Sequence, residues 1–273
     1  WCVNCNTALS DIEVEHKDDA GNLWYIQYPV VEEEGTFLTI ATTRPETMLG
    51  DTAVAVNPED PRYGHLVGKH LRLPITDRII PIIADSYVDL EFGTGAVKIT
   101  PAHDQNDYEV GQRHDLKMIT VIGFDGRMTA EAGEKYASLT TKECRQAVLE
   151  DLEELGLRRG EEEITHEVGH CYKCDTVIEP LLKEQWFVDM EPLAKKAIET
   201  LKAGKIKFHP ANKQKVLINY LQNLKDWNIS RQIPWGIAIP MFHQVGAEGV
   251  ERPSSEDRKL GRTALSVSEE EGF

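Results

Sequence analysis

Residues 93–107 read GTGAVKITPAHDQND, in which a glycine turn leads into a short strand and the strand ends in a polar turn. The Gly-Thr-Gly turn lets the backbone approach another group closely. On the strand predicted at 96–100, Lys98 and Thr100 are two residues apart and therefore face the same side. This stretch decides the fold class because the same alternation of short strand and turn recurs through the first half of the chain.

The strand and turn pattern extends from residue 11 to about residue 122. It predicts strands at 12–15, 23–31, 36–40, 53–56, 71–73, 79–83, 96–100 and 118–122. Short strands separated by Gly, Pro, Asn and Asp indicate a closed or nearly closed, β-barrel-like structure, and they leave no room for the helices of a doubly wound sheet. Helical periodicity predicts helices at 107–116, 141–155, 192–203 and about 212–224. The expected fold class is mainly β with helices (α+β).

The chain has 273 residues, which is typical of about two domains, and 41% of them are hydrophobic, enough for a sizeable core. Acidic residues outnumber basic ones by 46 to 30, giving a net charge of −16. This balance argues against a non-specific nucleic-acid binder but allows a specific RNA partner held by a few contacts. No run of about 18 apolar residues predicts a membrane span. Because the chain begins at Trp1 without a leader, we expect a piece of a longer protein.

Five cysteines, an odd number, favour a reducing compartment over a secreted disulfide framework. Four of them form two CxxC pairs: Cys2 with Cys5, and Cys171 with Cys174. Two thiolates from each pair would complete the tetrahedral shell of a structural Zn²⁺ ion and clamp together the ends of the chain between them. A redox CxxC and four incidental thiols are the alternatives, and His170 is a substitute ligand. Cys144 lies on an apolar helix stripe and is predicted to be a core residue.

The segment TTRPETMLGD, residues 42–51, follows a predicted strand and opens a turn or helix at Pro45. It places three threonines beside one arginine: Thr42, Thr43, Thr47 and Arg44. Hydroxyl groups, a guanidinium and the free N–H groups of a helix start can together hold an anion or a polarised carbonyl. A helix cap is the alternative interpretation, but a cap requires only one threonine.

Asp104 and Asp107 follow the strand of Lys98 and Thr100, so that an ammonium, a hydroxyl and two carboxylates can converge on one place. Taken alone, two aspartates at a helix start more often cap the helix than bind a ligand. A metal site is a further alternative whose spacing matches no metal-binding template: His103, Asp104, Asp107 and His114. The motifs of covalent serine nucleophiles, zinc peptidases and phosphate-binding loops do not occur. The sequence therefore predicts a hydroxyl-rich pocket with an ammonium-binding carboxylate, which positions water on a reactive ester.

Three segments carry a resemblance to a known family: TTRPETMLGDTAVAVNP at 42–58, IIPIIADSY at 79–87 and FGTGAVKITPAHDQND at 92–107. They resemble the editing domain of the class I aminoacyl-tRNA synthetases, and YEVGQRH at 108–114 is similar to the valyl enzymes. Residues 226–236 resemble the stretch that re-enters the synthetic core, and the resemblance covers about residues 1–243. An isoleucyl or leucyl relative is the alternative, but the former usually lacks Asp after Pro-Ala-His and the latter usually continues with Trp-Glu-Phe.

The resemblance and the cysteine pairs imply a division of the chain: 1–10 and 165–180 as the two halves of a zinc knuckle, 11–164 as the editing domain, and 181–243 as a short α/β return segment toward the catalytic core. Residues 244–273 are polar and without periodicity, and we expect a flexible or unplaced tail there. The ATP-handling signatures of the family, His-Ile-Gly-His and Lys-Met-Ser-Lys-Ser, are absent from this sequence. We therefore expect neither an ATP site nor a Mg²⁺ site in this chain, and no ATP-dependent synthesis by it alone.

The implied activity is post-transfer editing, the hydrolysis of threonine mistakenly esterified to valine tRNA. The implied catalytic residues are Asp107, holding the α-ammonium group, with Thr47 and Lys98. The implied substrate-binding residues are Thr42, Thr43, Arg44, Thr100 and Asp104. Asp104 would read the threonine hydroxyl with Lys98 and Thr100, and Arg44 would lie near a phosphate or ribose.

The implied partners are the 3′ end of valine tRNA carrying threonine and the rest of the synthetase chain. A cytoplasmic monomer without membrane contact is expected. The alternative function is a tRNA-binding or structural zinc module that is inactive in isolation.

Overall fold

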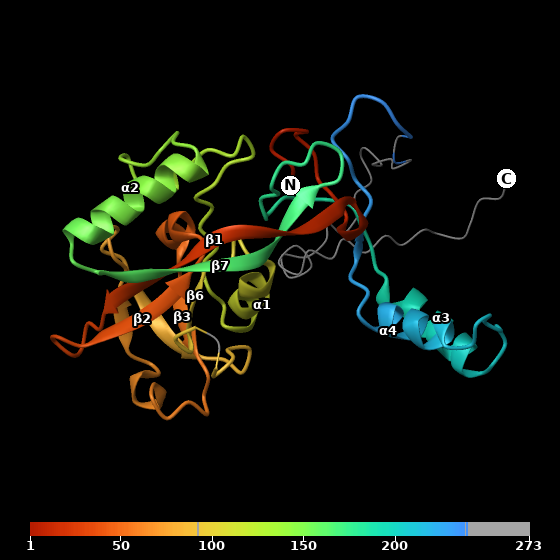
Figure 1. Ribbon diagram of the computed structural model, residues 1–273, viewed down its shortest axis with the longest axis horizontal. Helices are drawn as coiled ribbons and strands as arrows, with labels where there is room; N and C mark the ends of the chain where they lie inside the picture. Colours follow the sequence, from red (N-terminus) through yellow and green to blue (C-terminus); the bar gives the residue numbers. More distant parts are fainter. Residues whose placement is uncertain (92, 238, 240–273) are drawn as a thin grey trace, which may run out of the picture. The chain divides into compact units, whose positions relative to one another are not determined.

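The computed structural model describes residues 1–91, 93–237 and 239, which divide into two compact units (Figure 1). Of the described residues, the larger unit contains 1–6 and those from 14 to 182, and the smaller unit contains 7–13 and those from 183 to 239. The tail expected at 244–273 lies outside the described residues. None of the described helices combines the length and the hydropathy that a bilayer crossing requires.

The first sheet of the larger unit has three antiparallel strands in the order β2-β1-β7 (Figure 1). Their bounds are β1 Val14–Pro29, β2 Phe37–Thr42 and β7 Arg158–Cys171. The second half of β1 alternates between buried and partly exposed side chains, and Ile26 and Tyr28 are fully buried. The first half of β1 is largely exposed, and its backbone pairing with β7 keeps it in the sheet.

The second sheet of the larger unit has four short strands in the order β4-β5-β3-β6. Their bounds are β3 Ala53–Val56, β4 His70–Arg72, β5 Ile79–Ala84 and β6 Ala96–Ile99. Strand β3 is buried on both faces: Val54 and Val56 pack in the main hydrophobic core, whereas Ala53 and Ala55 pack in a second cluster. β6 pairs with β3 so that Lys98 lies opposite Val54, which carries the lysine into the interior of the unit.

The two sheets do not close into the barrel that the sequence predicts. Within the described residues of this unit, 1–91 and 93–182, a single backbone bridge joins the two sheets. It pairs Val30 with Leu71. Strands of three to six residues in the second sheet offer too few ladder hydrogen bonds to continue pairing around a closed circumference. The larger unit is therefore a mixed α/β structure of two separate sheets with helices.

The short segments around the second sheet position the polar residues of interest. Helix α1, Gln105–Arg113, follows β6 after a turn at residues 100–104 and is capped by Asp104. The segment after β2 forms a short 3-10 helix, η2 Pro45–Gly50, rather than an α-helix, and all six of its residues are buried. Further 3-10 turns are η1 Asp11–Glu13, η3 Gly64–Leu66 and η4 Ala130–Ala132.

Helix α2, Thr141–Glu154, closes the main core, because its buried stripe packs into that cluster. It begins with a capping box between Thr140 and Glu143. Cys144 on the stripe is fully buried, which confirms its prediction as a core residue. In the smaller unit, helices α3 Glu191–Lys202 and α4 Lys213–Gln222 form a hairpin, with a two-stranded sheet of β8 Phe187–Val188 and β9 Trp227–Asn228.

Two predicted strands differ from the structure, and one observed strand was not predicted. The prediction at 12–15 is wrong in its first half, because residues 11–13 form a 3-10 turn and β1 begins only at Val14. The stretch 118–122 forms only the isolated bridge Ile122↔Met128. Strand β7 was not predicted, and this acid-rich strand satisfies its backbone by pairing with β1 while only its last two side chains are buried.

Candidate functional site

The turn between β2 and η2 is built by threonine side chains. The Thr42 hydroxyl accepts a hydrogen bond from the Arg44 N–H at 3.0 Å, and the Thr47 hydroxyl donates to the Arg44 carbonyl at 2.9 Å. Thr43 is half-buried, and the described residues offer its side chain no recorded hydrogen bond. Two of the three predicted threonines therefore shape the turn, and Thr47 also reaches the residues of β6.

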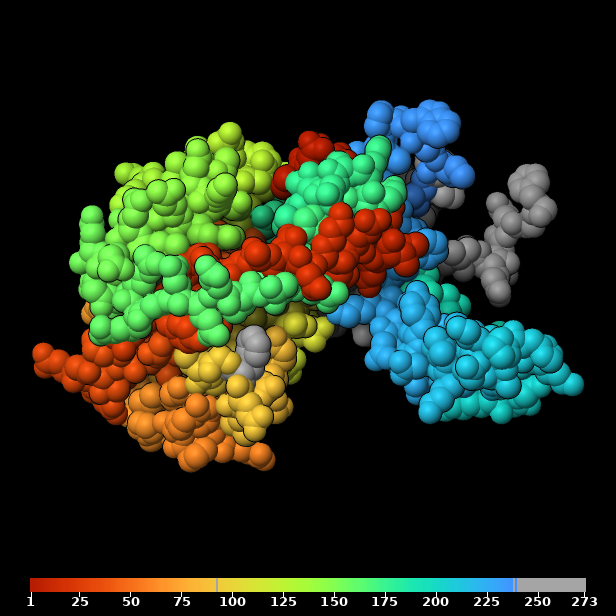
Figure 2. Space-filling view, in the orientation of Figure 1, coloured from red at the N-terminus to blue at the C-terminus, as the bar shows by residue number. Residues whose placement is uncertain are grey.

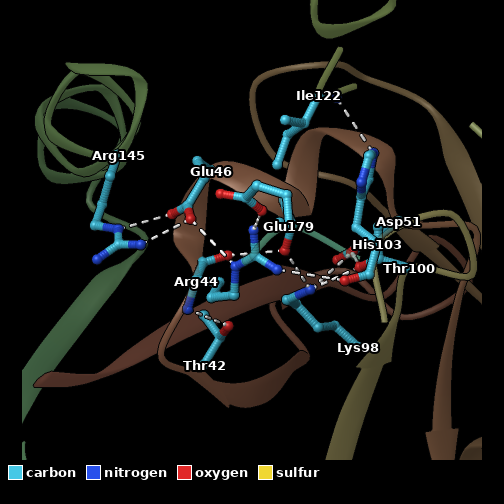
Figure 3. A network of polar contacts seen from close by, with 11 residues as sticks. Thr42, Arg44, Glu46, Asp51, Lys98, Thr100, His103, Ile122, Arg145 and Glu179 are labelled. Atoms are coloured by element: carbon cyan, nitrogen blue, oxygen red, sulfur yellow. Dashed lines mark hydrogen bonds and ion pairs between the residues drawn. The ribbon is translucent and has the colours of Figure 1, made fainter. Parts of the chain in front are cut away.

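Lys98 is the centre of a buried polar network (Figure 3). Its ammonium donates to the hydroxyls of Thr100 at 2.6 Å and Thr47 at 2.9 Å, and lies 3.4 Å from Asp51 Oδ1. The Thr100 hydroxyl donates to the same Asp51 oxygen at 2.5 Å, and the Tyr28 hydroxyl donates to Asp51 Oδ2 at 2.8 Å. All three N–H donors of Lys98 thus have partners inside the protein. Burial raises the pKa of Asp51, and the adjacent ammonium and hydroxyl groups oppose that rise.

Asp107 lies on the other side of Thr100. Its Oδ2 accepts a hydrogen bond from the Thr100 backbone N–H at 2.8 Å, and the side chain is buried. Burial raises the pKa of Asp107 to about 7, the Lys98 ammonium opposes the rise, and the charge of Asp104 adds to it. Asp104 itself is exposed and accepts hydrogen bonds from two N–H groups of α1, so its observed role is that of a helix cap.

Arg44 is engaged in ion pairs rather than free for a ligand (Figure 3). Its guanidinium pairs with Glu179 and Glu46, and it donates to the His103 carbonyl at 3.3 Å. Glu46 is fully buried and also receives two hydrogen bonds from Arg145, both at 2.8 Å. The opposite charges hold the pKa of Glu46 below its usual range although burial acts in the other direction.

The two histidines considered as metal ligands lie in other environments. His103 is buried, and its Nε2 accepts hydrogen bonds from the N–H groups of Val121 at 2.8 Å and Ile122 at 3.3 Å. Burial, with Arg44 nearby, lowers the pKa of His103 to about 4, so the ring is neutral at pH 7. His114 Nε2 lies 2.9 Å from Asp85. The histidine and aspartate metal site is therefore not assembled.

The four cysteines of the CxxC pairs do come together, although the pairs are far apart in the sequence. Their sulfur atoms all lie within 4.8 Å of one another: Cys2, Cys5, Cys171 and Cys174. Across the part of the chain that the structure describes, this is the one group of three or more such side chains arranged to share an ion. His170 does not join it, because its ring nitrogens face Asp19 and the backbone carbonyl of Asp175.

The main partners that sequence reasoning missed are carboxylates and the side chains that bind them: Tyr28, Glu46, Asp51, Arg145 and Glu179. Glu46 and Asp51 lie within the segment 42–51. A buried lysine requires a carboxylate partner, so Lys98 was the signal that could have revealed Asp51. Glu179 and Arg145 come from distant parts of the chain and carry no local signal.

Residues 1–271 match the family described as tRNA synthetases class I (I, L, M and V). A valine–tRNA ligase of Carboxydothermus hydrogenoformans is 58% identical over 243 residues, which cover 89% of this chain and 27% of the relative. A valine–tRNA ligase of Thermotoga maritima is 50% identical over 277 residues, which cover 99% of this chain and 31% of the relative. The chain thus spans less than a third of the length of these curated relatives.

Among solved structures, the LeuRS of Agrobacterium radiobacter K84, in a ternary complex with tRNA and LeuAMS, is similar with a TM-score of 0.41 and 18% identity. The similarity covers 62% of this chain and 24% of that one. At this level it does not identify a common fold.

Proposed function

The chain belongs to the class I tRNA synthetases (I, L, M and V), and from that premise we propose that its larger unit is an editing domain. The proposed reaction is the hydrolysis of threonine mistakenly esterified to valine tRNA. The partners would be the 3′ end of that tRNA and the rest of a longer synthetase chain, of which residues 181–243 would be the return segment. The high identity to valine–tRNA ligases supports the valyl rather than the isoleucyl or leucyl branch.

The observation that carries the proposal is the position of Thr100 between two buried carboxylates, Asp51 and Asp107. Valine and threonine have nearly the same shape, so an apolar synthetic site discriminates poorly against the added hydroxyl. A polar site selects in the opposite direction. It pairs the threonine hydroxyl, whereas valine would leave a buried polar group unpaired at a cost of about 1–3 kcal/mol.

The contacts of each residue refine the roles within this proposal. Asp107 has a single recorded hydrogen bond from the described residues and is the carboxylate that would accept the substrate's α-ammonium group. Lys98 has no spare donor, so it would act by holding the hydroxyls of Thr47 and Thr100 in place. Thr100 and Asp104 would read the threonine hydroxyl.

The turn at residues 42–47 would cradle the ester carbonyl and the terminal adenosine. Arg44 would fix this turn through its ion pairs with Glu46 and Glu179, instead of contacting a phosphate directly. We assign no general base to the hydrolytic water. Positioning of water by hydroxyl groups would therefore supply the rate.

The test compares hydrolysis of threonyl and valyl esters of valine tRNA by the 273-residue chain. We expect the threonyl ester to be cleaved faster, and Asp107→Asn to lower the rate about 10- to 100-fold because an ammonium contact to a charged group is lost. Asp151→Asn is the matched control, since Asp151 is partly buried and its recorded partners are Lys135 and Tyr136. Equal cleavage of both esters contradicts the proposal, and binding of tRNA without turnover favours a binding module.

We also propose that the four clustered thiolates hold one structural Zn²⁺ ion. Tetrahedral zinc thiolate sites have sulfur atoms about 3.8 Å apart, and the observed cluster is compact enough to accept this geometry. The ion would join the first residues of the chain to the end of β7 and would take no part in hydrolysis.

Metal analysis of the purified chain should find one zinc per chain, and Cys171→Ala should abolish it. The matched control is Cys144→Ala, because Cys144 is a buried cysteine outside the cluster and its loss should leave the zinc content unchanged. Absence of stoichiometric zinc would refute the metal site and leave the editing proposal untouched.

A further inference from the structure

The smaller unit carries a basic stretch that stands out in an acidic chain. Residues 200–225 contain six lysines and no carboxylate, whereas the whole chain has 46 acidic residues among 273. Five of the six lie between the last residue of α3 and the first turn of α4: Lys202, Lys205, Lys207, Lys213 and Lys215. We call residues 202–215 the lysine tip.

The lysines of the tip are available to a ligand. All five are exposed, and none of them makes an ion pair or a side-chain hydrogen bond recorded within residues 1–91, 93–237 and 239. In the larger unit, by contrast, several lysines pair with carboxylates: Lys17, Lys69, Lys98 and Lys135. Five neighbouring positive charges that form no ion pair within the described residues create a field that attracts an anionic partner.

The backbone of the tip is ordered by hydrogen bonds of its own. Helix α3 ends at a turn in which Gly204 has a φ of +68°, and the Lys205 N–H donates to the Thr200 carbonyl at 3.3 Å. The Gln214 side chain donates to the Leu201 carbonyl at 2.9 Å, which ties the start of α4 to the end of α3. Leu201 is buried beneath this junction. The lysines therefore project from a defined frame, which lowers the entropy cost of binding a partner.

We propose that the lysine tip binds the phosphate backbone of a structured RNA. Lysine contributes affinity for phosphates by displacing their counter-ions and reads no base sequence. An acidic protein surface fits less well, because protein interfaces are enriched in arginine and aromatic residues and depleted of lysine, and the tip has five lysines and no arginine. The identification of the RNA as the tRNA substrate rests on the proposed function.

This assignment explains how a chain with a net charge of −16 can engage a polyanion. The negative charge of the remainder repels RNA, so a local basic surface directs the encounter to one place. The lysine tip would hold the body of the RNA, a task separate from the chemistry at the 3′ end.

The test measures binding of an unacylated valine tRNA transcript to the 273-residue chain by fluorescence anisotropy between 50 and 200 mM KCl. The variant is Lys205→Glu with Lys207→Glu, two exposed residues of the loop between α3 and α4. The matched control is Lys142→Glu with Arg159→Glu, which changes the net charge equally at exposed residues of the larger unit. We expect the tip variant to bind about tenfold more weakly at 50 mM KCl, with a logarithmic salt slope smaller by about 1.5.

Equal affinities and salt slopes for the parent, tip variant and control would overturn the inference. A tip variant that unfolds at lower temperature but binds RNA normally would also overturn it, because the lysines would then pair with protein carboxylates. If threonyl-tRNA is not hydrolysed by any form while the tip variant still loses affinity, the editing proposal fails and this inference stands.

Discussion

Asp51 and Asp107 are two buried carboxylates on either side of Thr100, and they differ in how completely they are bonded. Asp51 meets the hydroxyls of Tyr28 and Thr100 and the ammonium of Lys98. Asp107 receives one recorded hydrogen bond from the described residues, that of the Thr100 N–H. A fully bonded carboxylate holds a structure together, whereas an under-bonded one remains able to accept a partner. The comparison therefore assigns Asp51 to stability and Asp107 to function.

The sharpest way to break this comparison is to remove Asp51. Asp51→Ala leaves the buried Lys98 ammonium without its counter-charge, so we expect a loss of about 3–5 kcal/mol in the free energy of unfolding, measured by urea denaturation. Adding Lys98→Met should recover part of the loss, because the unpaired charge is then gone. A loss below about 1 kcal/mol would show that Asp51 is not the structural member of the pair.

Removal of the Asp107 charge should stabilise the protein, whereas removal of Asp51 should destabilise it. Its pKa of about 7 in the folded protein lies above the usual aspartate value, so the folded state binds more protons than the unfolded state between pH 4 and 7. Stability from this group is present at low pH and is lost as pH rises through 7. Asp107→Asn should therefore be more stable than the parent at pH 8, by at most about 4 kcal/mol, and equal to it at pH 3. A destabilised variant at pH 8 would place Asp107 with the structural carboxylates.

His103 provides a titration of the opposite sign on the same unit. Its pKa of about 4 lies below the usual histidine value, so stability from this group is present above pH 6.5 and is lost as pH falls through 4. The two slopes oppose each other between pH 4 and 6.5. His103→Gln keeps an acceptor for the Val121 N–H and removes the histidine titration, so that of the two only the Asp107 slope remains. The unfolding free energy of the variant should therefore rise by about 1–3 kcal/mol as pH falls from 6.5 to 4. A parallel pH profile in parent and variant would contradict this account.

The sequence predicted the parts of the site that depend on local spacing. Lys98 and Thr100 share a face because they are two residues apart on a strand, and Asp107 follows at the start of the next helix. It could not predict their partners, because Tyr28 and Asp51 reach Thr100 and Lys98 through tertiary packing. The ion pairing of Arg44 depends on Glu179, 135 residues away, so no local pattern could reveal that this guanidinium is engaged.

The fold shows the same division between local and distant information. The predicted strand at 53–56 was found with the same bounds because its four apolar residues lie between turns. Strand β7 was missed because it is acid-rich and buries only its last two side chains, so its long ladder with β1 holds it in the sheet without an apolar pattern. The barrel was wrong because strand positions do not determine whether the sheet edges pair, and that depends on ladder length and register.

The smallest expected effect separates the two roles of Asp104. Asp104→Ala removes the cap of α1 and should cost about 1 kcal/mol in the free energy of unfolding. Asp104→Asn keeps an oxygen that can accept from the N–H groups of Asn106 and Asp107, so its stability should be nearly that of the parent. If Asp104 only caps the helix, Asp104→Asn should also hydrolyse threonyl-tRNA at the parental rate.

If Asp104 also reads the threonine hydroxyl, Asp104→Asn should narrow the preference for threonyl over valyl esters while urea denaturation remains unchanged. The two variants thus separate the contribution of Asp104 to stability from its contribution to substrate recognition. A change in ester preference in Asp104→Ala alone, proportional to its loss of stability, would place Asp104 beside Asp51 as a structural residue. In that case Thr100 alone would discriminate between the two amino acids.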